Sequence, residues 1–103
     1  MFVHQGTLTL RSDVTTAQID DIVGGLLDLP NSIPEVAAAQ VARDAGLSDG
    51  NAHLTFRMSF VDAAAWQAYR VHPAHVAVIK EFIAPVLESK AFVQYDEAAM
   101  VTS

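Results

Sequence analysis

The residues best suited to chemistry lie in one short segment, Tyr69-Arg70-Val71-His72-Pro73-Ala74-His75, which holds two of the chain's four histidines and one of its two tyrosines. A phenol and two imidazoles can together hold, donate and accept a proton near neutral pH. No other part of the sequence carries comparable chemistry. The segment is therefore the first candidate for a functional site.

Two interpretations of this segment stay open. In the chemical one, His75 is a general base, and the Tyr69 hydroxyl hydrogen-bonds the oxyanion that develops on a substrate carbonyl. In the structural one, both side chains pack at a helix junction, where the histidine hydrogen-bonds backbone that the proline leaves free. His72 precedes the proline and is expected at a helix N-cap.

The remaining histidines are weaker candidates. His4 lies on an apolar strand face beside Gly6, whose missing side chain would leave space for a pocket, although a packed core or interface histidine is the alternative. We expect His53 to be solvated. No carboxylate near His72 and His75 completes a set of metal ligands, and no glycine-rich phosphate loop is present, so we expect neither a metal nor a nucleotide cofactor.

Composition and charge limit the function classes. The 103 residues predict a single domain. The net charge is −6 and the six Lys and Arg residues are scattered, which argues against nucleic acid and anionic membranes as partners. Hydrophobic residues reach 51%, which is apolar for so small a domain, and a second copy covering apolar surface would explain it. We therefore expect a homodimer.

Targeting signals are not recognisable in the sequence. The first residues lack the charged and apolar regions of a signal peptide, and no apolar run approaches the roughly 18 residues of a membrane span. The chain has no cysteine, which is consistent with a reducing compartment. We expect a soluble, cytoplasmic protein.

The strands that must position these residues follow from alternation of apolar and polar side chains. Residues 2–10 and 52–60 alternate, and residues 91–96 form a shorter run of the same kind. Residues 35–45 are ambiguous, because their alanine content favours a helix while their place in the overall pattern favours a strand.

Capping signals predict the helices. The run Thr15-Thr16-Ala17-Gln18 fits a capping box, and the helix that it starts is expected to end just before Pro30. Asp62 is expected to cap a short helix that stops near His72, and Pro73 is expected to open the next one. The order β-α-β-β-α-α-β predicts an α+β fold with helices on one face of the sheet, a domain over residues 1–97 and a frayed tail over 98–103.

This order accompanies two sequence patterns, Phe60-x-x-x-x-x-Trp66-x-x-Tyr69-x-x-His72-Pro73-x-His75 and Val93-x-Tyr95-Asp96. Together they resemble the stress-responsive dimeric A/B barrel (Dabb) family over nearly the whole chain. The resemblance implies a ferredoxin-like four-stranded antiparallel sheet with helices on one face, paired with a second copy into a dimeric α+β barrel. It also implies that residues 35–43 are the second strand.

The Tyr-x-x-His-Pro-Ala-His segment is similar to that of family members of the olivetolic acid cyclase type, which close a polyketide by an aldol reaction. That resemblance implies a catalytic role for Tyr69 and His75 and a pocket position for His4. Two sites differ from that type. Leu54 stands where a third-strand histidine is expected, and Ile22 with Val23 replaces an aromatic pair.

We therefore predict a homodimeric barrel that binds a small apolar or polyketide-like ligand. If it is an enzyme, it is a cofactor-independent cyclase or lyase that performs aldol-type chemistry on a β-carbonyl substrate, with Tyr69 and His75 as catalytic residues. The alternative is a non-catalytic stress-responsive Dabb protein. The candidate ligand-binding residues are His4, Gly6, Leu8, Ile22, Val23, Leu26, Phe56 and His72.

Overall fold

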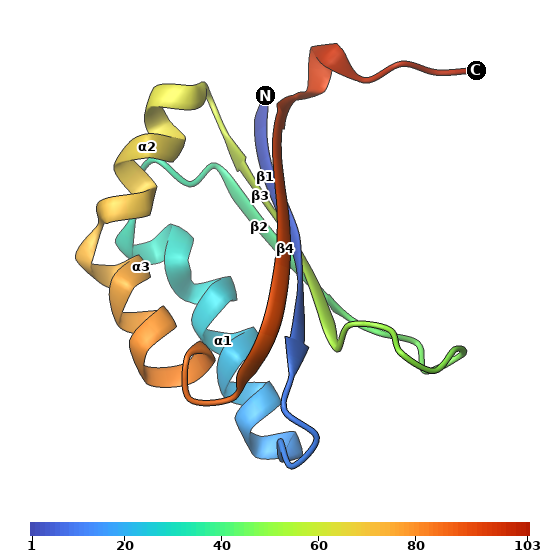
Figure 1. Ribbon diagram of the computed structural model, residues 1–103. Helices are drawn as coiled ribbons and strands as arrows, with labels where there is room; N and C mark the ends of the chain where they lie inside the picture. Colours follow the sequence, from blue (N-terminus) through green and yellow to red (C-terminus); the bar gives the residue numbers. More distant parts are fainter.

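The computed structural model describes residues 1–103 and consists of two layers, an antiparallel sheet and a layer of helices on one of its faces (Figure 1). The strands are β1 (Phe2–Leu10), β2 (Ala38–Arg43), β3 (Leu54–Phe60) and β4 (Leu87–Asp96). They lie in the order β2-β3-β1-β4, so β1 is central and pairs with both β3 and β4. The order of elements predicted this α+β sheet with helices on one face, and the family resemblance implied its ferredoxin-like arrangement.

The helical layer contains α1 (Thr16–Ser32), α2 (Ala63–Val71) and α3 (Pro73–Val78). A single π-helical turn, η1 (Ile79–Ile83), continues α3, and a 3-10 turn, η2 (Glu97–Ala99), follows β4. The predicted caps are confirmed. Thr15 and Gln18 form the capping box of α1, and the Asp62 carboxylate accepts the Ala65 N–H at 2.9 Å.

The predicted end of the first helix is wrong. Helix α1 runs to Ser32 with Pro30 inside its last turn. A proline inside a helix removes the hydrogen bond that its own N–H would have donated, and its ring crowds the carbonyl four residues earlier. The last turn of α1 still forms, because the N–H of the C-cap residue Ile33 donates to the Leu29 carbonyl at 2.9 Å.

The ambiguous segment at residues 35–45 contains strand β2, as the family resemblance implied and against its alanine-based helix propensity. Tertiary contacts outweigh propensity here, because β2 pairs along its whole length with β3. Val41 lies opposite Phe56 and packs on the core. The last strand begins at Leu87, four residues before the predicted start at residue 91.

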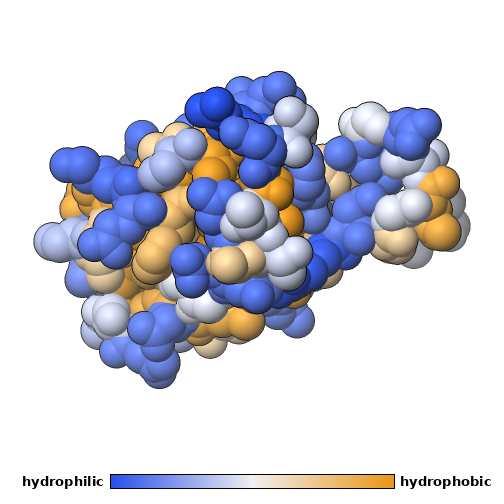
Figure 2. All heavy atoms as spheres, turned by 90° about the horizontal axis from the view of Figure 1, so that it is seen from below, coloured by the Kyte–Doolittle hydropathy of each residue, from blue (hydrophilic) through white to orange (hydrophobic).

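The core lies between the sheet and the helices. Alternation holds along β3, where Leu54, Phe56, Met58 and Phe60 are all buried. The opposite face of the sheet carries no helix or strand (Figure 1). Hydrophobic residues also reach the surface among hydrophilic ones (Figure 2), and Val93 on β4 is 51% exposed. No helix has the length and apolar character that crossing a membrane requires.

Candidate functional site

A cavity of about 610 Å³ lies between the sheet and the helices. This volume falls within the roughly 300 to 1,000 Å³ typical of small-molecule sites. Nine of its 14 lining residues are hydrophobic. The lining consists of His4, Leu8, Leu26, Phe56, Trp66, Tyr69, Arg70, His75, Ile79, Ile83, Leu87, Lys90, Phe92 and Gln94.

The cavity brings together six of the ten residues predicted for the site. These are His4, Leu8, Leu26, Phe56, Tyr69 and His75. The other four, Gly6, Ile22, Val23 and His72, do not line it.

Packing explains where those four residues lie. The space beside Gly6 that we expected to be open is filled by the ring of Phe92, which a Cβ at position 6 would contact. Ile22 is fully buried in the core, and Val23 packs against that core. His72 caps α3, where its Nδ1 accepts the Ala74 N–H at 3.1 Å, as its place before Pro73 predicts.

His75 is positioned by the break between α2 and α3. In a continuous helix the Arg70 carbonyl would accept the Ala74 N–H, but that group donates to His72 instead. His75 Nδ1 lies 3.0 Å from the Arg70 oxygen. A carbonyl oxygen only accepts, so Nδ1 carries the hydrogen, and in the neutral ring Nε2 is the free acceptor.

His4 has the opposite tautomer. Its Nδ1 lies 2.9 Å from the Gln94 amide nitrogen, which donates, so the neutral ring carries its hydrogen on Nε2. Burial, followed by the charges of His75 and Arg70, lowers the pKa of His4 from 6.5 to about 4. His4 is therefore a neutral hydrogen-bond donor at neutral pH.

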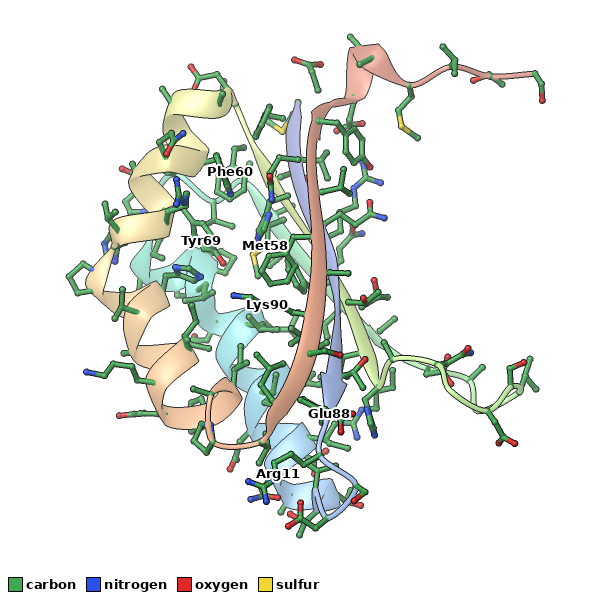
Figure 3. The ribbon with its side chains drawn as sticks, viewed as in Figure 1. Arg11, Met58, Phe60, Tyr69, Glu88 and Lys90 are labelled. Carbon is green, nitrogen blue, oxygen red and sulfur yellow. The ribbon has the colours of Figure 1, made fainter.

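Tyr69 is the largest side chain buried at the cavity wall and is 2% exposed. Its ring lies 4.2 Å from that of His75 and 6.2 Å from that of His4, measured between centroids. Burial raises its pKa, so the phenol stays protonated across the physiological range. Its hydroxyl takes part in none of the chain's side-chain hydrogen bonds, which leaves it available to a ligand. Figure 3 shows Tyr69 and Lys90 directed into the same space from opposite layers.

Sequence reasoning missed the wall that β4 contributes. Lys90, Phe92 and Gln94 alternate along β4 and lie opposite Leu8, Gly6 and His4 of β1. The signal was available, because an i, i+2, i+4 set on a strand shares one face. Lys90 was missed because the strand was predicted to begin only at residue 91, whereas Phe92 and Gln94 lay within the predicted strand and were not assigned to the site.

Burial also lowers the pKa of His75, with a smaller opposing effect of its hydrogen bond to Arg70 and a further lowering by Lys90. The ring is therefore neutral at pH 7, with the lone pair of Nε2 available as a base. In one cavity, neutral His75 can remove a proton from the carbon next to a carbonyl. The Tyr69 hydroxyl and the His4 N–H can then donate hydrogen bonds to the resulting oxyanion. No group of three or more His, Cys, Asp or Glu side chains is placed to hold a metal ion.

The model of the stress responsive A/B barrel domain (Dabb) matches residues 2–97. A dimeric ferredoxin-like protein of unknown function from Thermobifida fusca is 29% identical, with a TM-score of 0.81, and the match covers 91% of this chain and 88% of that one. No curated protein matches the sequence.

Two further solved structures share the fold at lower identity. A protein from Arabidopsis thaliana is 19% identical, with a TM-score of 0.85, over 99% of this chain and 100% of that one. A hydroxynitrile lyase from Passiflora edulis is 21% identical, with a TM-score of 0.80, over 91% of this chain and 90% of that one. At this level of identity the likeness concerns the fold alone.

Proposed function

The chain belongs to the stress-responsive A/B barrel domain (Dabb) family, and from that premise we propose that it is an enzyme whose side chains remove a proton next to a substrate carbonyl, as in an aldol-type cyclisation of a polyketide-like chain. The observation that carries the proposal is the free Nε2 of His75, on a ring 4.2 Å from that of Tyr69 at one cavity wall.

The proposed reaction begins with His75. Its Nε2 takes a proton from the carbon next to a carbonyl, and the electrons of the broken C–H bond move to the carbonyl oxygen, giving an enolate. The Tyr69 hydroxyl donates a hydrogen bond to that oxygen, with the His4 N–H as a second donor. The enolate carbon then forms a bond to a second carbonyl carbon of the same chain, and the new alkoxide takes the proton back from His75.

The protonation states support this assignment of roles. A general base must be unprotonated before it can accept a proton, and the lowered pKa of His75 keeps its ring neutral near pH 7. A hydroxyl donor must keep its proton, which the raised pKa of Tyr69 ensures. The apolar cavity suits an alkyl or aromatic ketide. The lyase from Passiflora edulis indicates that one protein of this fold has lyase activity.

A non-catalytic role for the junction would use only one nitrogen of His75. The bond from Nδ1 to Arg70 satisfies the backbone at the helix break. That structural role leaves Nε2 without a function, whereas the enzymatic proposal uses both nitrogens.

Deuterium exchange tests the proposal without the natural substrate. The probe is methyl 3-oxooctanoate in D2O, and proton NMR follows loss of the signal from the protons at C2. We expect the protein to accelerate exchange over buffer, and Tyr69→Phe to lower that acceleration by about 100-fold because it removes one oxyanion donor. Lys80→Gln, outside the cavity, should exchange like the unmodified protein. Exchange at the buffer rate by the unmodified protein would overturn the proposal.

We also propose that the protein acts as a homodimer in which the open face of the sheet meets that of a second copy. The relative from Thermobifida fusca is described as dimeric. The exposed Val93 lies on that face, because its neighbour Gln94 points into the cavity and side chains alternate along a strand.

A further inference from the structure

The cavity holds an unusual share of the chain's free positive charge. Of the six Lys and Arg residues, the three arginines at positions 11, 43 and 57 form ion pairs with carboxylates. The other three, Arg70, Lys80 and Lys90, form none, and two of them, Arg70 and Lys90, line the cavity. No Asp or Glu lines it, although the chain has twelve acidic residues. An acidic protein therefore has a cationic cavity.

Arg70 and Lys90 are both exposed, and each lies over an aromatic ring of the cavity wall. The Arg70 guanidinium carbon lies 5.1 Å from the centroid of the Trp66 ring, and its Nη1 donates to Gln67 at 3.0 Å. The Lys90 ammonium lies 5.2 Å from the centroid of the Phe92 ring. Cations over aromatic faces are attracted by the ring quadrupole, which places them without neutralising them.

The two cations act on the same space from opposite layers. Arg70 belongs to α2 and Lys90 to β4. Arg70 contributes to the lowered pKa of His4, and Lys90 to that of His75, so both charges reach the imidazoles of the cavity. Trp66 adds a buried indole N–H that has no hydrogen-bond partner.

We propose that Arg70 and Lys90 recognise a carboxylate on the ligand, so that the natural substrate or product is an apolar acid rather than a neutral ketone. The guanidinium of arginine matches a carboxylate with two parallel hydrogen bonds, and charge-assisted bonds of this kind are about twice as strong as neutral ones. A carboxylate carries one charge on a small group, which suits a cavity whose remaining wall is mostly apolar. An acid of this kind would be the class of substrate for the proposed reaction. Carboxylate binding by Arg70 and Lys90 depends on the proposed function only for the part of the ligand that reacts at His75.

Calorimetric titration with a matched pair of probes tests the inference. 4-Butylbenzoate carries the carboxylate and 4-butylbenzamide is its neutral counterpart. We expect the benzoate to bind about tenfold or more tightly than the amide, the range of a charged hydrogen bond. Arg70→Gln and Lys90→Gln should each reduce this preference and the double variant should abolish it. Arg70→Lys should keep part of it, and Lys80→Gln, which removes the same charge outside the cavity, should keep all of it.

Other outcomes would overturn the inference. These are equal affinity of the unmodified protein for the two probes, no binding of either probe, or an equal loss of preference in Lys80→Gln. Inorganic phosphate added as competitor distinguishes the anion, and displacement of the benzoate at equal concentration would assign the cations to a phosphate instead.

Calorimetry measures binding and needs no turnover, so the carboxylate site and the proposed catalysis can fail separately. A protein that binds the benzoate but does not exchange the ester protons supports the cation pair and rejects the proposed catalysis, and the reverse result rejects the cation pair alone.

Discussion

At the scale of single residues, the proposed mechanism gives the two nitrogens of His75 different roles, with Nδ1 at the helix junction and Nε2 as the base. The sequence left two interpretations of this histidine open, a base and a helix-junction residue. The contact from Nδ1 to the Arg70 carbonyl fits the second and at the same time sets the tautomer that the first requires. Histidines at proline breaks therefore need not be assigned to one role, because the two ring nitrogens are chemically distinct.

His4 makes stability depend on pH. Its pKa is about 4 in the folded protein against 6.5 for a free histidine, so between these values the unfolded chain binds a proton that the folded chain does not. The stabilisation is complete above pH 6.5 and is lost as the pH falls toward 4. Urea unfolding should show a decrease in the free energy of unfolding on the order of 1 to 2 kcal/mol between pH 6.5 and pH 5.

His4→Gln should reduce this decrease. Lys80→Gln, which lies outside the cavity and keeps all four histidines, should show the full decrease. A His4→Gln variant with the pH dependence of the unmodified protein would contradict the argument from burial.

The site was only partly predictable at this scale. Tyr69 and His75 stood out because both carry proton chemistry and they lie six positions apart. Arg70 and Lys90 did not, since isolated cations in a sequence are usually solvated, and only the fold brings α2 and β4 to the walls of one cavity. Distance along the chain carries no information about such pairs.

At the scale of elements, the strands and caps were predictable because their signals are local. Alternation identified β1 and β3, and Asp62 and Pro73 marked the start of α2 and α3. Non-local effects accounted for the errors. Pairing with β1 extends β4 back to Leu87, and the last turn of α1 tolerates Pro30.

The contact between Gly6 of β1 and Phe92 of β4 gives a prediction at this scale. A Cβ at position 6 would meet the Phe92 ring and would lie 2.9 Å from the Ala91 carbonyl oxygen, so backbone as well as ring must move. Gly6→Ala should lower the free energy of unfolding by about 1 to 3 kcal/mol, as overpacking does.

Gly24 of α1 provides the matched control, because a Cβ there meets nothing within 4 Å. Gly24→Ala should raise the free energy of unfolding by up to about 1 kcal/mol, since alanine favours a helix interior. Chemical denaturation of both variants measures whether the free energy of unfolding falls in Gly6→Ala and rises in Gly24→Ala. A Gly6→Ala protein as stable as the unmodified one would show that the two strands tolerate the extra group.

At the scale of the whole molecule, the helices cover one face of the sheet and leave the other open (Figure 1). An antiparallel sheet can face water on one side. In this chain, however, hydrophobic residues make up 51% of the composition, and Val93 is half exposed on the open face. A second copy would cover that surface.

Light scattering coupled to size exclusion should therefore give twice the chain mass of 11.1 kDa at micromolar concentration. Val93→Glu should shift the protein toward the monomer, because it places a charge in the proposed interface. Leu27→Glu, on an exposed position of α1, should leave the dimer intact. A monomeric unmodified protein would contradict the proposed assembly.

The central claim is that Nε2 of His75 is a base in the cavity, and His75→Asn tests it most directly. The asparagine amide can take the place of Nδ1 as donor to the Arg70 carbonyl, while Nε2 has no counterpart. We predict a free energy of unfolding within about 0.5 kcal/mol of the unmodified protein, together with a fall of at least about 100-fold in the accelerated exchange of methyl 3-oxooctanoate. A folded His75→Asn protein that exchanges the ester protons at the unmodified rate would contradict the account.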